Sequence, residues 1–354
     1  MGMTGRLLLY GANGYTGNLI AELARGAGLV PVLAGRNGER IAALAQRLGF
    51  EHRVFGLDIP STIDACLEGV EVVLHCAGPF ARTAQPMVDA CLRTRTHYLD
   101  VTGEVTVFEA LAARSEEARA AGVMLLPGVG FDVVPSDCLA LHTARRIERP
   151  TTLRIAIRGI GAMSHGTATT MVENLHKGSW VRRDGRLERI HAGSLTRRFD
   201  FGRGPRLAMA VPWGDLATAY RSTGIANIET YFATSRGMVW GARTFGRLPW
   251  LIGSGPVQRL LQRRIDARPA GPTAAERERG RSSFVVEVEN AAGERAVSRL
   301  HTLEGYTLTA LTALDIARRA LGGDAPVGFQ TPAMAYGPDL IMGIAGTQRE
   351  DVPV

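Results

Sequence analysis

Lysine is nearly absent from this chain: Lys177 is the only lysine among 354 residues, although the formal net charge is +7. The chain therefore lacks the tyrosine–lysine pair of short-chain dehydrogenases, because the position four before Lys177 is Glu173. Schiff-base chemistry would have to use Lys177 itself, which we interpret instead as a cation at a helix end. The arginines form no dense block with interleaved aromatic residues, so we expect no nucleic-acid partner.

Cysteine and long apolar runs are also scarce. None of the four cysteines stands in a C-x-x-C pair or beside paired histidines, so we expect reduced cysteines and no metal site. No apolar run is long enough to span a bilayer. The first apolar segment begins at residue 7, which leaves no room for a signal peptide, and we expect a cytoplasmic protein. The cysteines are Cys66, Cys76, Cys91 and Cys138.

Short apolar segments alternate with helical patterns over the first 126 residues. The apolar segments are residues 7–10, 30–33, 53–55, 72–75, 98–100 and 123–126. This alternation predicts a doubly wound parallel sheet of the α/β class, with ligands at the carboxyl ends of its strands. The length of 354 residues, with 45% hydrophobic and 21% charged residues, predicts a globular protein of two domains.

Three glycines spaced three apart, Gly11, Gly14 and Gly17, follow the first apolar segment and precede a helical pattern. This layout predicts a turn that holds the pyrophosphate of a dinucleotide against a helix N-terminus. A glycine-rich turn that binds nothing is the alternative. The predicted cofactor site also includes the residues between these glycines, namely Asn13, Tyr15 and Thr16.

The second apolar segment leads into Arg36 and Asn37, and no acidic residue follows before Glu39. NAD sites place a carboxylate here on the ribose 2′-hydroxyl, whereas NADP sites avoid that carboxylate and often supply an arginine. A guanidinium also pairs well with a phosphate dianion and stacks on adenine. We therefore predict NADP(H) rather than NAD, with Arg36 and Asn37 in the site. An ordinary exposed arginine is the alternative.

Two further segment ends complete the predicted cofactor site. Asp58 would accept a hydrogen bond from the adenine amino group, or would begin a helix before Pro60. Small residues after the fourth segment would let the nicotinamide ribose come close. These residues are Ala77, Gly78, Pro79 and Phe80.

Four residues are candidate proton partners for a hydride transfer. Tyr98 and Asp100 alternate along one segment and so face the same side, although core packing and capping are alternatives. Asp132 follows a glycine-rich turn, where it would orient substrate or cap the turn. His165 stands at a helix start, where a neutral imidazole is a sound general acid or base, or is an ordinary surface residue.

The pattern changes to a mixed α/β domain after residue 126. Residues 283–289 and 295–302 predict two strands joined by a hairpin, followed by a helix over residues 304–321. Residues 238–261 are rich in apolar side chains and arginines. They predict a buried connection or subunit contact, or alternatively an amphipathic flap over an apolar substrate or a membrane surface.

These patterns divide the chain into two predicted domains. The first is a Rossmann domain over residues 1–126, to which residues 327–354 return. The second is a mixed α/β domain over residues 127–326 for substrate binding and dimerisation. We expect a homodimer, because two-domain Rossmann enzymes commonly form dimers.

Several motifs together resemble the saccharopine dehydrogenase-like oxidoreductases, whose bacterial branch includes trans-acting enoyl reductases. The motifs are residues 11–17, 34–36, 76–80, 97–104, 130–132 and 135–137, and later residues 271–277, 305–306 and 330–333. The resemblance implies an NADP(H)-type Rossmann domain, a larger mixed domain and a C-terminal segment that returns to the first domain. Saccharopine itself is not an expected substrate, since no cationic constellation for its carboxylates can be assigned.

Two functions of different classes follow from these observations. The first is an NADPH-dependent reductase that acts on a C=C, C=N or C=O bond of a small, lipid-like or polyketide-like substrate. The second is a protein that senses NADP(H), or scaffolds a complex, without turnover. Only the reductase needs a proton donor within reach of the nicotinamide.

Overall fold

The computed structural model describes residues 6–159, 164–166, 168–169, 178–246, 254–267 and 269–353. It contains two compact units, each described by itself below. The first comprises Met1–Val134 and Tyr306–Ala335, and the second comprises Pro135–Gly305 and Tyr336–Val354.

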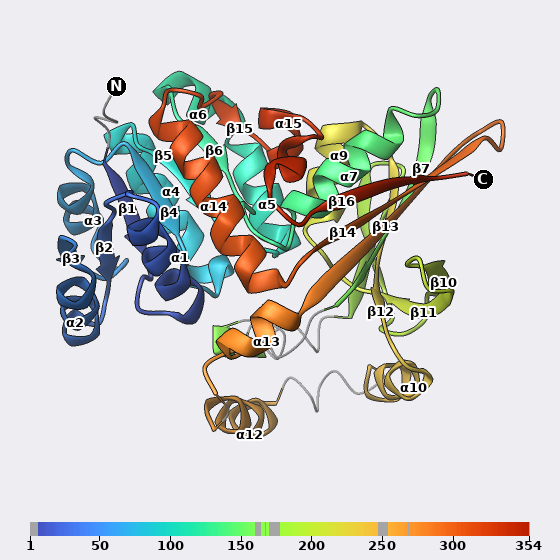
Figure 1. Cartoon of the computed structure of the whole chain (residues 1–354), viewed down its shortest axis with the longest axis horizontal. Helices are drawn as coiled ribbons and strands as arrows, with labels where there is room; N and C mark the ends of the chain where they lie inside the picture. The colour runs from blue at the N-terminus through green and yellow to red at the C-terminus, as the bar shows by residue number, and fades with distance from the viewer. Residues whose placement is uncertain are drawn as a thin grey trace. The chain divides into compact units, whose positions relative to one another are not determined.

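A seven-stranded parallel sheet forms the centre of the first unit, in the order β15-β6-β5-β4-β1-β2-β3 (Figure 1). Apart from the edge strand β3, whose residues are exposed or half-buried, the strands are mostly apolar and buried, because helices cover both faces of a parallel sheet. Their bounds are β1 (Leu7–Tyr10), β2 (Val32–Gly35), β3 (His52–Val54), β4 (Val72–His75), β5 (His97–Asp100), β6 (Met124–Leu126) and β15 (Gly328–Phe329).

The helices of this unit form two groups. α3, α4, α5 and α6 pack against one another, while α1 packs against α2. α14 joins the α1 group, since the guanidinium of Arg318 donates to the carbonyl oxygen of Ala27 at 2.9 Å. The bounds are α1 (Tyr15–Gly26), α2 (Gly38–Leu48), α3 (Pro60–Leu67), α4 (Phe80–Thr94), α5 (Val105–Ala113), α6 (Ser115–Ala121) and α14 (Gly305–Leu321).

A mixed sheet of nine strands forms the second unit, in the order β10-β11-β12-β7-β13-β14-β16, with β8 paired to β12 and β9. The predicted hairpin is present: β13 and β14 pair antiparallel from Arg281 opposite Leu303 to Glu289 opposite Arg295. The bounds are β7 (Pro150–Arg158), β8 (Ser179–Arg183), β9 (Arg186–Ile190), β10 (Thr196–Asp200), β11 (Pro205–Ala210), β12 (Asn227–Ala233), β13 (Arg281–Asn290), β14 (Arg295–Leu303) and β16 (Gln348–Val352).

Helices flank this second sheet. An apolar cluster packs on one face of it, built around Phe199, Tyr231 and Val285. The helices are α7 (Val134–Ala144), α9 (Asp215–Thr223), α10 (Arg236–Phe245), α12 (Gly255–Asp266) and α13 (Ala274–Arg279), with the 3-10 helix η2 (Leu340–Gly343). The short helix α15 (Pro332–Tyr336) belongs to the first unit except for its last residue. The predicted α/β class, with a parallel sheet first and a mixed sheet after it, is confirmed.

The units divide the chain differently from the predicted domains in two places. α14, expected in the second domain, packs in the first unit, where the hydroxyl of Thr312 donates to the carbonyl oxygen of Val129 at 2.8 Å. β16, expected to return to the first domain, instead pairs antiparallel with β14. Only β15 returns to the first sheet, beside β6. Lys177 and most of the helix expected to start near His165 lie outside the described residues.

Candidate functional site

The turn between β1 and α1 has the geometry that the three glycines predict. Gly11 adopts φ +80°, and a Cβ there would lie 2.8 Å from the backbone nitrogen of Ala77. A Cβ on Gly17 would lie 2.4 Å from the carbonyl oxygen of Gly11. Gly14 is exposed, and a Cβ there would meet only that same oxygen, at 3.2 Å. Two of the glycines therefore pack backbone on backbone, and the third leaves the turn open to a ligand.

The N-terminus of α1 carries no side-chain cap and no acidic residue in its first turn. Its N-cap residue is Gly14, and Tyr15, Thr16 and Gly17 follow as the first helical residues. The first N–H groups of a helix have no intrahelical acceptor, and the helix dipole favours an anion there. The ring of Tyr15 packs edge-on against Tyr306, with the ring centroids 5.0 Å apart. The turn and this helix end together fit a pyrophosphate.

The end of β2 lies beside this turn. A Cβ on Gly35 would lie 3.1 Å from Oδ1 of Asn13, so the exposed loop residue Asn13 covers the strand end. Arg36 follows and is exposed. The Asn37 side chain accepts a hydrogen bond from the backbone N–H of Arg40 at 3.0 Å, and so caps α2. Asn37 therefore has a structural role, whereas its predicted role as a cofactor ligand stays a prediction.

Arg40 is a second cation at this edge that the sequence analysis did not single out. It lies in the first turn of α2 and lines a surface cavity of about 350 Å³ together with Asn13 and Arg47. Arg47 is paired with Glu22 at 3.0 Å. Within the described residues, the guanidinium groups of Arg36 and Arg40 form no ion pair or hydrogen bond. Arg36 precedes the N-cap of α2 and Arg40 lies in its first turn, so both basic residues stand at the start of this helix.

Asp58 follows β3 and is exposed at the same edge of the sheet. The hydroxyl of Tyr10, at the end of β1, donates to the carbonyl oxygen of Phe55 at 3.1 Å. Burial raises the pKa of Tyr10 to about 12, while the charge of Arg36 lowers it and the charge of Asp58 raises it. Both charges are thus close enough to act on Tyr10, so the structure brings Arg36 and Asp58 to one end of the sheet.

The loop after β4 is fixed by its own hydrogen bonds. The Thr83 hydroxyl donates to the carbonyl oxygens of Ala77 at 2.6 Å and Pro79 at 3.2 Å. Nε2 of the buried His75 lies 3.0 Å from the same hydroxyl. Because that hydroxyl proton points to the carbonyls, Nε2 of His75 is the donor. Burial lowers the pKa of His75 to about 3, so the ring is neutral. Ala77, Gly78, Pro79 and Phe80 are therefore held in one arrangement at this edge.

The side chain of Glu104, from the loop after β5, contacts the loop after β4. Its carboxylate accepts from the backbone N–H groups of Phe80 at 2.8 Å and Ala81 at 3.2 Å, which are the first two of α4. No side chain at the N-cap position serves α4, so Glu104 takes that role from the next loop. No sequence pattern indicated this contact.

Tyr98 and Asp100 lie side by side at the end of β5, as predicted, and both are completely buried. The Tyr98 hydroxyl donates to Oδ2 of Asp100 at 2.8 Å. Oδ1 of Asp100 accepts from the backbone N–H groups of Thr102 and Gly128, each at 2.9 Å. Burial raises the pKa of Asp100 to about 6, although these hydrogen bonds lower it. The pair thus joins the loops after β5 and β6, and its predicted catalytic role stays a prediction.

Asp132 follows β6 and is partly buried beside the loop after β5. A Cβ on Gly103 would lie 2.6 Å from Oδ2 of Asp132, so the carboxyl group occupies the space that a side chain at Gly103 would fill. Desolvation raises the pKa of Asp132 to about 7. A carboxyl group with that pKa exchanges protons near neutral pH.

His165 belongs to the second unit, whereas the other candidate proton partners belong to the first. Its backbone N–H donates to the carbonyl oxygen of Ala270 at 3.1 Å, and its side chain is half-buried. Its predicted catalytic role stays a prediction.

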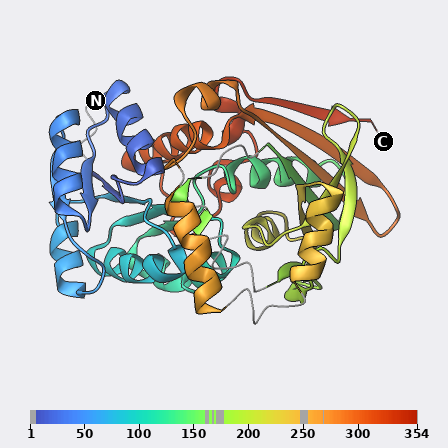
Figure 2. The ribbon, with the colours of Figure 1, turned by 90° about the horizontal axis from the view of Figure 1, so that it is seen from below.

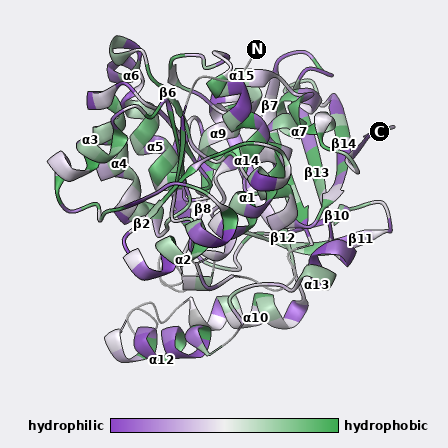
Figure 3. Ribbon diagram, turned by 60° about the vertical axis from the view of Figure 1, so that its left-hand side comes forward, coloured by the Kyte–Doolittle hydropathy of each residue, from purple (hydrophilic) through white to green (hydrophobic). Residues whose placement is uncertain are grey.

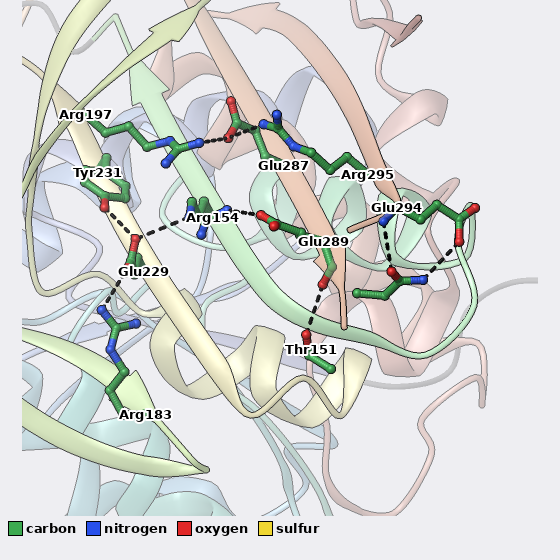
Figure 4. Close-up of polar contacts among 11 residues, drawn as sticks. Thr151, Arg154, Arg183, Arg197, Glu229, Tyr231, Glu287, Glu289, Glu294 and Arg295 are labelled. Carbon is green, nitrogen blue, oxygen red and sulfur yellow. Dashed lines mark hydrogen bonds and ion pairs between the residues drawn. The ribbon is translucent and has the colours of Figure 1, made fainter. Parts of the chain in front are cut away.

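A second polar cluster lies on the sheet of the second unit (Figure 4). Glu229 on β12 accepts from the Tyr231 hydroxyl at 2.5 Å and pairs with Arg183 and, at 3.6 Å, with Arg154. Arg154 also pairs with Glu289 at 3.1 Å. Burial would raise the pKa of Glu229, but these hydrogen bonds and charges outweigh it and lower that pKa. Because its members satisfy one another, we assign this cluster to holding the strands together.

The described ranges contain neither a cluster of metal ligands nor a membrane-spanning helix. No group of three or more histidine, cysteine, aspartate or glutamate side chains there is arranged to hold a metal ion. No helix in those ranges has the length and apolar character needed to cross a membrane.

A parallel sheet in this strand order, with a glycine turn at an uncapped helix N-terminus, defines the class of dinucleotide-binding Rossmann domains. Residues 7–126 match the family described as the saccharopine dehydrogenase NADP binding domain, and this part of the chain belongs to that family. The predicted resemblance is confirmed.

Relatives named as trans-acting enoyl reductases also match the chain. The Mycobacterium bovis (strain BCG / Pasteur 1173P2) protein is 27% identical over 401 residues, which cover 96% of this chain and 95% of that protein. The Mycobacterium leprae (strain TN) protein is 36% identical over 149 residues, 40% of this chain and 36% of that protein. Two Mycobacterium tuberculosis proteins match at 34% identity over 187 residues. These matches cover 49% of this chain and 45% of the length of each of the two proteins.

One solved structure shows the fold of the whole chain. The apo saccharopine dehydrogenase (L-Glu forming) of Saccharomyces cerevisiae aligns with a TM-score of 0.65 and 13% identity, over 99% of this chain and 100% of that structure. This likeness supports the arrangement of a parallel sheet followed by a mixed sheet.

Proposed function

We propose that this protein is an NADP(H)-dependent oxidoreductase that reduces a C=C, C=N or C=O bond of a small, lipid-like or polyketide-like substrate. The observation that carries the proposal is the glycine turn at the uncapped α1, flanked by Arg36 and Arg40 after β2. The names of the relatives favour a C=C bond conjugated to a carbonyl group as the substrate.

The residues fit NADP(H) at four places along the sheet edge. The backbone from Gly11 to Gly17 would hold the pyrophosphate. Arg36 and Arg40 would hold the 2′-phosphate, because both guanidinium groups are available and Glu39 is the only acidic residue of the first turn of α2. Asp58 would accept from the adenine amino group. The loop of Ala77 to Phe80 would line the nicotinamide ribose.

NADPH, when bound, supplies a hydride; the protein has to supply a proton and the orientation. We propose Asp132 as the proton-exchanging residue, since its pKa of about 7 keeps much of it protonated at neutral pH. In an enoyl reduction, Asp132 would protonate the α-carbon after hydride reaches the β-carbon. We propose Tyr98 and Asp100 as positioning residues, because Asp100 fixes Gly128 at the start of the loop that carries Asp132.

Nicotinamide fluorescence titrations with NADPH and NADH test this proposal. We expect Arg36→Ala and Arg40→Ala each to weaken NADPH binding by about 10–100-fold, the loss of one charge-assisted contact, and to leave NADH binding unchanged. Arg6→Ala is the matched control, because Arg6 is exposed and precedes β1 at the opposite edge of the sheet.

Two outcomes would count against the proposal. If neither nucleotide binds the wild-type protein, the oxidoreductase assignment is wrong. If NADPH binds but is not oxidised with α,β-unsaturated thioesters, imines or ketones, the protein is a sensor or scaffold that binds NADP(H) without turnover.

A further inference from the structure

Two helices of the second unit expose large apolar side chains. On α10, Met238 is 63% exposed and Trp240 is 69% exposed, and on α12, Leu260 is 54% exposed. In the described part of this unit, no other large hydrophobic side chain is as exposed as these three. Soluble surfaces carry single exposed apolar residues without consequence, whereas several on one side of a unit, as on these two helices, mark an interaction site.

The same two helices are basic. Asp266 is the only acidic residue in either helix, and it is engaged, since Gln262 donates to its carboxylate at 2.9 Å. Their arginines are Arg236, Arg243, Arg259, Arg263 and Arg264. Except for Arg243, these guanidinium groups have no ion pair or hydrogen bond within the described ranges. The surface therefore has unneutralised positive charge.

Each helix is attached to the unit along its inner side. Val239 of α10 is buried, and the Arg243 guanidinium donates to the carbonyl oxygen of Gly193 at 2.8 Å. Ile265 of α12 is buried, and Gln262 bonds with Thr169 at 3.2 Å. The exposed apolar side chains and the four arginines other than Arg243 are thus left on the outer sides. Figure 2 shows both helices on the side that faces the viewer.

We propose that the outer sides of α10 and α12 bind the surface of a bilayer that contains anionic lipids. The arginines match lipid phosphates, and Trp240, Met238 and Leu260 match the interfacial layer beneath the headgroups. Figure 3 shows hydrophilic and hydrophobic residues alternating along these helices, as expected for elements that lie on a membrane rather than cross it. A nucleic acid would also attract the arginines but would leave the three apolar side chains without a role.

Flotation of the full chain with lipid vesicles tests the proposal. We expect binding to phosphatidylcholine vesicles that contain phosphatidylglycerol, weaker binding at high salt, and little binding to pure phosphatidylcholine. The triple variant Arg259→Gln, Arg263→Gln, Arg264→Gln should weaken partitioning about 100-fold, because each arginine near an anionic surface contributes about a factor of five. Trp240→Ser should weaken it several-fold at constant charge.

A charge-matched triple variant serves as the control. Arg186→Gln, Arg198→Gln and Arg206→Gln remove three exposed arginines from strands of the same unit and should leave vesicle binding nearly unchanged. The unfolding temperature of every variant shows whether a loss of vesicle binding comes from unfolding. An NADPH titration of every variant tests the cofactor assignment separately from this proposal.

Three results would overturn the proposal. The first is equal binding to neutral and anionic vesicles. The second is equal loss of binding in the α12 variant and the charge-matched control. The third is binding of a DNA duplex, with the same dependence on the α12 arginines, together with no vesicle binding; the surface would then recognise nucleic acid.

Discussion

Two helix N-termini lie at the same edge of the first sheet and differ in what faces them. α1 begins at Gly14 without a side-chain cap and without an acidic residue in its first turn. α4 begins at Phe80, and the carboxylate of Glu104 accepts from its first two N–H groups. Because an uncapped helix end attracts an anion and a carboxylate-capped end does not, only α1 is prepared for a phosphate. The protein thus selects one of two equivalent backbone sites by placing a single side chain.

The charges along this edge divide in the same way. Arg36 and Arg40 follow β2, next to the strand that leads into α1. Asp100, Glu104 and Asp132 follow β5 and β6, on the far side of β4. The arginine half is suited to a phosphate-bearing nucleotide, and the acidic half, where burial raises carboxyl pKa values, is suited to proton exchange.

Gly17→Ala should distort the turn before α1 and so remove the predicted phosphate site at its N-terminus. The new Cβ would lie 2.4 Å from the carbonyl oxygen of Gly11 and 2.8 Å from Cα of Ala12, so the backbone of the turn has to move. We expect a loss of about 3 kcal/mol in the free energy of unfolding and no measurable NADPH binding. The control is Gly26→Ala at the other end of α1, where no atom lies within 4 Å of the new Cβ. It should change neither the free energy of unfolding nor NADPH binding. Equal effects of the two substitutions would contradict the packing argument.

Glu104→Ala should make α4 resemble α1. The N–H groups of Phe80 and Ala81 lose their acceptor, and we expect a loss of about 2 kcal/mol in the free energy of unfolding. Sulfate should then raise the unfolding temperature of the variant more than that of the wild type, because the helix end has become an anion site. Glu116→Ala removes an exposed carboxylate paired with Arg119 and should cost less than about 1 kcal/mol. The absence of any extra sulfate effect would contradict the capping role.

Asp132→Asn tests the raised pKa of this carboxyl group through the pH dependence of stability. The unfolded chain releases this proton near the ordinary pKa of 3.8, whereas the folded protein keeps it to about pH 7. Wild-type stability therefore falls as pH rises from 4 to 7, and the variant, which has no such proton, should gain stability relative to the wild type over that window. Turnover should fall at least 100-fold with NADPH affinity retained. A stability difference between variant and wild type that does not change with pH would contradict the raised pKa of Asp132.

Asn37→Ala should have the smallest effect. It removes the cap of α2 and should cost about 1 kcal/mol, which Asn37→Ser should largely restore. NADPH affinity should change little, since the side chain already accepts from the N–H of Arg40. A loss of affinity that serine does not restore would instead assign Asn37 to the cofactor site, as the sequence predicts.

The predictable parts of the site are those that depend on neighbouring residues in the chain. Gly11, Gly14 and Gly17 predict their own turn, because each glycine's role follows from its position between a strand and a helix. The capping role of Glu104 depends on contact between two loops, and no sequence pattern records that contact. Burial of the carboxyl of Asp132 depends on the missing side chain at Gly103, which is likewise a contact across loops.

The second unit shows one signal that was present and overlooked. Asp184 and Gly185 join β8 to β9 with φ +46° and +76°, the two-residue hairpin that an Asp-Gly pair favours. The flanking strands contain many arginines, so their apolar alternation is weak.

The strand β15 of the first sheet is only two residues long and carries no pattern of its own. Its place beside β6 is decided by tertiary contacts, as when Phe329 N–H donates to the Ser115 hydroxyl at 3.1 Å.

The interleaving of the two units has a consequence for how the chain is made. Translation completes β6 at residue 126, but β15 emerges only after residue 329, when most of the other unit has been synthesised. Until then the nascent first sheet has β6 as an unpaired, apolar edge and lacks α14, a condition that favours association with chaperones or with other chains. A protein cut after residue 134 would keep this exposed edge permanently. The nucleotide-binding half is therefore not a portable module that can be fused to another protein, even though its phosphate turn is complete within the first 17 residues.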